Sequence, residues 1–166
     1  MPALLAELAV PSAAQMRGLG RRLATLLTAG DLVVLTGPLG AGKTTLVQGL
    51  GEGLGVRGPV TSPTFVIARI HPSLDGGPDL VHADAYRLGS QAEVDDLDLD
   101  ADLDRSVTVV EWGEGLVEEL ADSHLEITIA MGHGDSRAVR LVGRGERWET
   151  LTQSARLALT NGLQAL

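Results

Sequence analysis

The stretch from Gly37 to Thr44 reads GPLGAGKT and fits the pattern GxxxxGK[ST]. In this pattern the glycines let the backbone curve around an anion, and the helix that follows adds the positive end of its dipole. The lysine reaches the β- and γ-phosphates of a nucleotide, and the final hydroxyl binds Mg²⁺. The sequence therefore predicts a phosphate-binding loop. The residues expected to contact the nucleotide are Pro38, Leu39, Gly40, Ala41, Gly42, Lys43, Thr44 and Thr45.

Lys43 is the only lysine of the chain, and the other twelve of its Lys and Arg residues are arginine. This usage indicates a coding bias that replaces lysine wherever arginine serves equally well. A phosphate loop is a place where it does not, because the loop needs a compact, mobile ammonium group rather than a rigid planar guanidinium. The alternative is a solvent-exposed lysine in a glycine-rich turn. The apolar segment before the loop and the helical segment after it favour the phosphate loop.

Two acidic residues are candidates to work with Lys43 in catalysis. Glu111 ends the apolar segment VTVVE, a position suited to a carboxylate that holds Mg²⁺ and orients an attacking water. Thr44 and Glu111 are thus the expected metal ligands. Asp84, in the segment HADAYR, is a second candidate for binding the metal or a water. If that segment is an extended strand, side chains alternate between its two faces, so His82 and Tyr86 lie on the same face as Asp84. The alternative for Glu111 is an ordinary acidic residue at the end of a strand. For His82 we favour a structural role, in which the histidine pairs with another residue.

Further polar and aromatic residues adjoin these candidates. The segment TSPTF follows the predicted helix, at a connection where many phosphate-loop proteins sense the γ-phosphate, and its proline stiffens the turn. A plain hydroxyl-rich turn is the alternative. This switch-like loop comprises Thr61, Ser62, Pro63, Thr64 and Phe65. Arg87 could pair with Asp84 or a phosphate. Tyr86 and Trp112 are candidates for contacting the nucleotide or a partner, with core packing as the alternative.

The elements that must position these residues alternate between apolar strands and amphipathic helices. We expect one α/β domain over residues 1–166, of the P-loop NTPase type, with a central, mostly parallel sheet flanked by helices and an antiparallel C-terminal edge. The segment GLGVRG over 53–58 fits GxGxxG but follows a helix, so it predicts a helix cap and a turn. Strands are expected over 4–10, 31–37, 63–70, 106–112, 124–131 and 137–143, and from residue 80. Helices are expected over 12–30, 43–54, 113–121 and 148–160.

Composition limits the classes of function. The net charge of −9 makes the chain a poor direct binder of nucleic acid, so we expect a partner to hold any nucleic acid with which it works. The chain has no cysteine, which excludes disulfides and thiolate metal sites and suits a reducing cytoplasm. We expect neither a signal peptide nor a membrane span. The run over 93–104 holds six aspartates without the glycine of an EF-hand; it predicts a solvated face or a docking surface for a basic partner.

Several classes of phosphate-loop protein do not fit. GTPases that read guanine through an NKxD motif need a second lysine, which the chain lacks. No LSGGQ-like signature of an ABC ATPase is present, and the chain is short for a helicase or AAA+ core. Two classes besides an ATPase remain open, which are a small-metabolite kinase and a nucleotide-gated binding module.

The motifs GPLGAGKTTL, TSPTF, HADAYRL and VVEWGE, in this order and spacing, make the chain similar to the TsaE (YjeE) family over about residues 4–142. The resemblance implies a small bacterial P-loop ATPase that uses ATP and Mg²⁺ in forming threonylcarbamoyladenosine at position 37 of tRNAs. It implies the TsaB–TsaD pair as partner, with tRNA reached only through that complex. It assigns the essential lysine and magnesium threonine to Lys43 and Thr44, the aspartate to Asp84 and the magnesium-linked glutamate to Glu111. Pro38 stands where the family usually has an aspartate.

Overall fold

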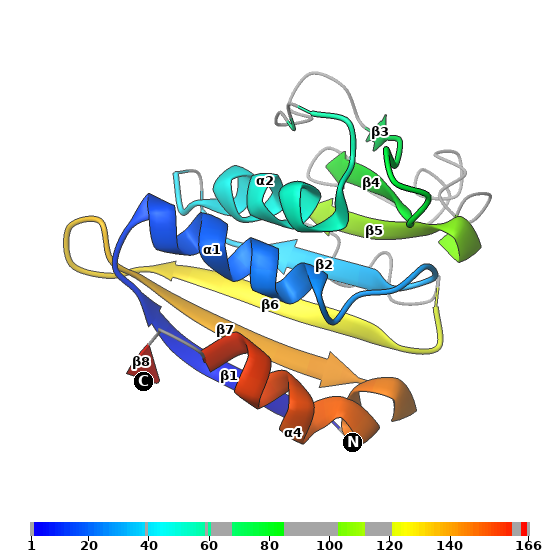
Figure 1. Ribbon diagram of the computed structural model, residues 1–166. Coiled ribbons are helices and arrows are strands. Elements are labelled where there is room, and N and C mark those ends of the chain that lie inside the picture. The colour runs from blue at the N-terminus through cyan, green and yellow to red at the C-terminus, as the bar shows by residue number, and fades with distance from the viewer. Residues whose placement is uncertain are drawn as a thin grey trace.

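The structure is a computed structural model, and it describes residues 2–38, 40–58, 60, 68–84, 103–111, 121–160 and 164–165. Its strands form one sheet in the order β3-β4-β5-β2-β6-β7-β1-β8 (Figure 1). The strands are β1 (Pro2–Val10), β2 (Leu32–Thr36), β3 (Ala68–His71), β4 (Asp79–Asp84), β5 (Ser106–Glu111), β6 (His124–Met131), β7 (Arg137–Arg144) and β8 (Gln164–Ala165). The helices are α1 (Ala13–Ala24), α2 (Lys43–Leu54) and α4 (Glu146–Thr160), with a 3₁₀ turn, η2, at Leu103–Arg105.

The centre of the sheet is parallel and its edges are antiparallel. Strands β4, β5, β2 and β6 run in one direction, whereas β3 pairs antiparallel with β4 and β7 with β6. The expected α/β fold with an antiparallel C-terminal edge is confirmed. That edge also takes in the N-terminal strand, because β1 pairs with both β7 and β8. Strands β6 and β7 form a hairpin with a loop over 132–136.

The central strands β2 and β5 are buried along most of their length. All six residues of β5 are buried, as are the first four of β2. A continuous apolar run is the sequence signature of such an interior parallel strand. Because β2, β4 and β5 are parallel, their carboxyl ends meet at one edge of the sheet, which is where the phosphate loop begins.

Helices α1 and α2 pack against each other with their backbones in close contact (Figure 1). A Cβ atom at Gly20 would lie 2.2 Å from the carbonyl oxygen of Leu46, and one at Gly49 would lie 2.0 Å from that of Arg17. Helix α2 ends in Gly55 at φ 71°, so the cap predicted for the GxGxxG segment is confirmed.

The start of α1 follows the prediction and its end does not. The side chain of Ser12 caps α1 by accepting from the backbone N–H of Gln15 at 3.2 Å, as its sequence position predicts. The helix ends at Ala24, earlier than the expected stop near Gly30. The cause is a turn that competes with the helix: the carboxylate of Asp31 accepts from the backbone N–H of Thr28 at 2.7 Å.

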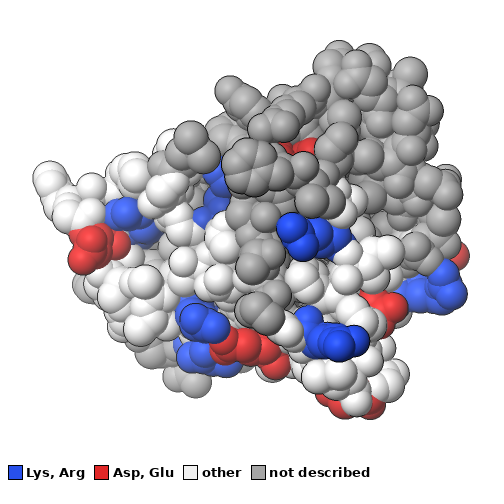
Figure 2. All heavy atoms as spheres, turned by 90° about the horizontal axis from the view of Figure 1, so that it is seen from above, with Lys and Arg blue, Asp and Glu red and all other residues white. Residues whose placement is uncertain are grey.

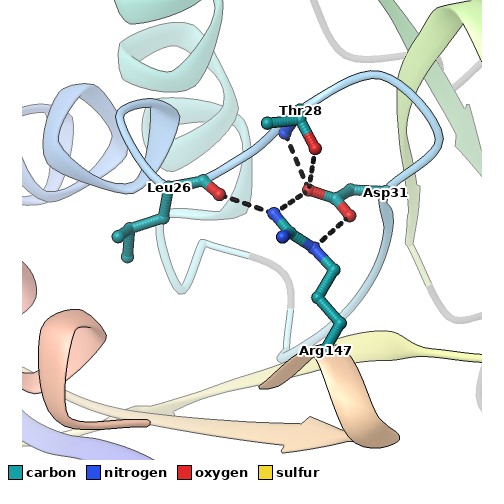
Figure 3. Close-up of polar contacts among 4 residues, drawn as sticks. All are labelled: Leu26, Thr28, Asp31 and Arg147. Carbon is teal, nitrogen blue, oxygen red and sulfur yellow. Dashed lines mark hydrogen bonds and ion pairs between the residues drawn. The ribbon is translucent and has the colours of Figure 1, made fainter. Parts of the chain in front are cut away.

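Helix α4 lies against β1 and β7 and is fixed at its first turn by Arg147 (Figure 1). The guanidinium of Arg147 donates to both oxygens of Asp31 at 2.7 Å and to the carbonyl of Leu26 at 2.8 Å (Figure 3). Asp31 immediately precedes β2, so this contact joins the C-terminal helix to the strand that leads into the phosphate loop. The buried side chains of α4 are Trp148, Ala155 and Leu159.

Some predicted boundaries changed and others fall outside the described residues. Helix α4 begins at Glu146, two residues before the expected start at 148. Strand β3 extends to His71, which pairs with Leu80, although a loop was expected from that residue. The start of the strand predicted over 63–70, most of the helix predicted over 113–121 and the acidic run before Leu103 lie outside the described residues. Among the described helices, none is long and apolar enough to cross a membrane.

Candidate nucleotide-binding site

The segment between β2 and α2 has the backbone of an anion-binding loop. Gly40 and Gly42 adopt φ values of 78° and 105°, which favour glycine. Gly42 is the N-cap of α2, and no side chain caps that helix. The first N–H groups of a helix need hydrogen-bond acceptors, and here no capping side chain supplies one. The start of α2 therefore has the geometry and the donors that a phosphate group needs.

Lys43 is folded back onto the loop that it follows. Its side chain is buried, and its Nζ donates to the carbonyl of Gly37 and, at 3.3 Å, to that of Pro38. Burial lowers the pKa of Lys43, and the carboxylates of Glu111 and Asp84 act in the opposite direction. The ammonium group thus lies in the field of both acids and within reach of an anion held by the loop.

Asp84 and Glu111 lie side by side. They end the neighbouring parallel strands β4 and β5 and are direct partners in the register of that pair. Glu111 is buried, and Asp84 is half-buried. The end of β2 lies at the same edge, so the structure brings Lys43, Asp84 and Glu111 to one place, as the sequence predicts. Thr44 and Thr45 occupy the first turn of α2 and are half-buried.

Glu111 has a partner that the sequence analysis did not assign to it. The Nε2 of His82 lies 2.6 Å from Oε2 of Glu111, and the His82 side chain is fully buried. An ionised carboxylate only accepts hydrogen bonds, so Nε2 donates. Among the described residues, the Nδ1 atom of His82 has no hydrogen-bond partner. The expected structural pairing of His82 is confirmed, but the partner is the candidate metal ligand itself.

A second missed residue comes from the far end of the sequence. Arg137, the first residue of β7, donates from Nη2 to the carbonyl of Gly40 at 3.3 Å. Its Nη1 donates at 2.9 Å to the carbonyls of Gly134 and Ser136. Arg137 therefore ties the β6–β7 hairpin to the phosphate loop. The two segments are 97 residues apart, and no local pattern in the sequence indicates this contact.

Several predicted site residues lie outside the described residues. They are Leu39 of the phosphate loop, the switch-like loop of Thr61, Ser62, Pro63, Thr64 and Phe65, and the contact candidates Tyr86, Arg87 and Trp112. The described part of the site combines backbone donors, one ammonium group, hydroxyls and two adjacent carboxylates. Backbone N–H groups and an ammonium suit phosphate oxygens, and hydroxyl and carboxylate oxygens suit Mg²⁺.

Comparisons with known proteins identify the family of this chain. A family model described as "Threonylcarbamoyl adenosine biosynthesis protein TsaE" matches residues 10–139. A protein of Streptomyces coelicolor named tRNA threonylcarbamoyladenosine biosynthesis protein TsaE is 66% identical over 140 residues, 81% of this chain and 95% of that protein. A Bacillus subtilis protein of the same name is 36% identical, covering 84% and 86%. The crystal structure of B. subtilis YdiB matches with a TM-score of 0.73 and 29% identity, covering 93% and 95%. The chain therefore belongs to the TsaE family.

Proposed function

We propose that this protein binds and hydrolyses Mg-ATP and that it acts in threonylcarbamoyladenosine formation on tRNA, together with TsaB and TsaD in the cytoplasm. The observation that carries the ATP-binding part is the position of Lys43. It lies at an uncapped helix start, within the field of Asp84 and Glu111, and its ammonium donates to two carbonyls of the loop. Phosphate oxygens would replace those carbonyls when a nucleotide binds.

The residues divide the work by their chemistry. Lys43 and the first N–H groups of α2 offset the charge of the β- and γ-phosphates. The hydroxyl of Thr44 and the carboxylate of Glu111 are the groups suited to hold Mg²⁺, which would neutralise charge that develops on the phosphates. Asp84 is the register partner of Glu111, and its carboxylate would accept a hydrogen bond from the attacking water.

The link to tRNA rests on the family and on charge. The relatives are named for tRNA threonylcarbamoyladenosine biosynthesis. On the face seen from above, Lys and Arg side chains lie beside Asp and Glu side chains (Figure 2). One exposed ion pair of the protein joins Arg21 to Glu52 at 2.9 Å. With a net charge of −9, such a surface favours tRNA contact through partner proteins over direct binding.

The test is phosphate release from Mg-ATP by the purified chain, alone and with TsaB, TsaD and tRNA. We expect hydrolysis that the partners stimulate. Hydrolysis that ignores the partners would contradict the assembly, and bound ATP without hydrolysis in any mixture would contradict the ATPase. Transfer of labelled phosphate to a metabolite would instead identify a kinase.

Lys43 provides the matched variants. We expect Lys43→Ala to abolish tight ATP binding, because it removes the one ammonium group of the site. Lys43→Arg should also fail, because a buried site that seats an ammonium on two loop carbonyls does not fit a planar guanidinium. Isothermal titration with Mg-ATP measures both. Unchanged affinity in Lys43→Ala would overturn the phosphate-loop assignment.

A further inference from the structure

The phosphate loop contains the three glycines Gly37, Gly40 and Gly42, which leave its backbone free to take many shapes. Glycine adopts positive and negative φ values about equally well. Fixing such a backbone in one conformation costs entropy, so a loop that becomes ordered only when an anion binds has a weaker affinity for that anion. Groups that already order the loop in the free protein therefore contribute to phosphate binding.

The peptide group between Gly40 and Ala41 is held at both ends. Its carbonyl oxygen accepts a hydrogen bond from Nη2 of Arg137 at 3.3 Å. Its N–H, which belongs to Ala41, donates to the carbonyl of Pro38 at 3.1 Å. Because a peptide group is planar, the two bonds together fix its orientation, and Gly40 takes the positive φ of 78° that this orientation requires.

Arg137 is itself firmly anchored. It begins β7, and its backbone lies between Met131 of β6 and Val10 of β1 in the register of the sheet. Its Nη1 donates at 2.9 Å to the carbonyls of Gly134 and Ser136 in the hairpin loop. The hairpin and the start of α2 lie at the same end of the sheet (Figure 1). A guanidinium has five N–H donors in a rigid fork, so one side chain bonds to both segments at once.

The bond from Arg137 differs from the bonds that Lys43 makes to the same loop. Nζ of Lys43 donates to the carbonyls of Gly37 and Pro38, and under the proposed function phosphate oxygens replace those carbonyls. The bond from Arg137 to Gly40 involves neither the lysine nor its carbonyls, so it does not have to break when the nucleotide binds. Arg137 is thus suited to hold the loop both before and after binding.

Building on the proposed function, we propose that Arg137 is a positioning residue for phosphate binding, which keeps the Gly40–Ala41 peptide group in its binding orientation before the nucleotide arrives. Without this bond, only a fraction of the free molecules have a loop of the right shape. The apparent Kd rises in inverse proportion to that fraction. Once the phosphates are bound they order the loop themselves, so the rate of hydrolysis at saturating ATP changes little.

Three variants separate position from charge. Arg137→Ala removes the bonds to the loop and to the hairpin. Arg137→Lys keeps the positive charge, but a single ammonium group does not reproduce the fork that joins the two segments. Arg140→Ala is the control, because Arg140 lies on the same strand and pairs with Glu7 at 3.3 Å in an exposed contact. Thermal unfolding of each variant confirms that it is folded.

Two measurements are made on each protein. The first is hydrogen exchange of the backbone amides of residues 40–44 in the absence of nucleotide. The second is the Kd of Mg-ATP by isothermal titration, together with the hydrolysis rate at saturating ATP with TsaB, TsaD and tRNA present. The exchange measurement reports the order of the loop directly and does not depend on ATP binding.

We expect Arg137→Ala and Arg137→Lys each to raise the Kd of Mg-ATP about tenfold, which corresponds to about 1.4 kcal/mol and is the size of one hydrogen bond. Loop amides should exchange about tenfold faster, since the same loss of order exposes them. The hydrolysis rate at saturating ATP should stay close to that of the wild type. Arg140→Ala should change none of the three quantities.

Wild-type affinity or wild-type exchange in Arg137→Ala would overturn the positioning role. Full recovery of affinity in Arg137→Lys would also overturn it, because the charge alone would then be enough. A loss of hydrolysis rate at saturating ATP as large as the loss of affinity would assign Arg137 to the chemical step instead. A wild-type protein that binds no Mg-ATP would contradict the proposed function, whereas the exchange comparison would still show whether Arg137 orders the loop.

Discussion

Hydrolysis should depend most on the carboxylate of Glu111, because it lies beside Asp84 where we expect the γ-phosphate of ATP. We expect Glu111→Ala to lower the rate of ATP hydrolysis by about a hundredfold and to change the Kd of ATP far less. Lys43 and the backbone donors of α2 would still bind the phosphates. The measurement is the hydrolysis rate with TsaB, TsaD and tRNA present, together with the Kd of ATP. Equal losses in both would indicate that Glu111 supports the fold.

His82 should act through Glu111. Its 2.6 Å hydrogen bond fixes the direction of the carboxylate, and a bond to a charged group contributes about 1.5–3 kcal/mol. We expect His82→Ala to lower the hydrolysis rate about tenfold with little change in the Kd of ATP, and His82→Gln, which keeps a donor, to recover part of it. His124→Ala is the control, because His124 pairs with Glu126 at 3.1 Å at the opposite end of the sheet. A loss in His124→Ala equal to that in His82→Ala would contradict the positioning role.

At the scale of residues, the sequence identifies site residues that belong to a local motif. It does not identify contacts that depend on the register between strands. Lys43, Asp84 and Glu111 could be predicted because each occupies a recognisable place in a loop or at a strand end. The bond from His82 to Glu111 depends on the parallel register of β4 and β5, which no local pattern specifies. The bond from Arg137 to Gly40 depends on the hairpin folding back beside the loop.

At the scale of elements, α1 and α2 approach each other closely at their glycines. A Cβ at Gly49 would lie 2.0 Å from a backbone oxygen of α1, so Gly49→Ala forces the helices apart. We expect it to lower the free energy of unfolding by about 1–3 kcal/mol, the usual cost of overpacking. Urea denaturation measures this loss. Gly18→Ala is the matched control in α1, since a Cβ there meets only arginine side-chain atoms at 3.7 Å.

The control variant Gly18→Ala should change the free energy of unfolding in the opposite direction. Alanine has a higher helix propensity than glycine, so Gly18→Ala should raise stability by about 0.5–1 kcal/mol. If Gly49→Ala were as stable as the wild type, the close contact between α1 and α2 would be wrong. The helix over Lys43–Leu54 was predictable from the motif and its glycine cap, whereas the glycine contact was not, because it requires the partner helix to be placed first.

At the scale of the whole molecule, the contact of Arg147 with Asp31 joins α4 to the central sheet (Figure 3). The family model ends at residue 139, so α4 lies beyond the matched region and is nevertheless fixed to the residue before β2. The positions of α4 and of β1, which lies between β7 and β8, were the least predictable parts of the fold. Both positions depend on contacts between segments that are far apart in the sequence. Such contacts produce no periodic pattern of residues from which they could be predicted.

The last prediction concerns this contact. Arg147→Ala leaves the carboxylate of Asp31, whose side chain is 7% exposed, without its ion partner. Removing one partner of a buried pair lowers the free energy of unfolding by about 3–5 kcal/mol, and the 29% exposure of Arg147 places this loss near or below the lower end of that range.

Arg140→Ala is the control, because Arg140 pairs with Glu7 at 3.3 Å in a surface contact that contributes at most about 1 kcal/mol. The Arg147→Ala loss should persist at high salt, since water and ions screen that pair poorly. Below its melting temperature the variant should still bind ATP, because the contact lies at the opposite end of β2 from the phosphate loop. Equal destabilisation by the two substitutions would show that α4 is attached to the sheet by its apolar face alone.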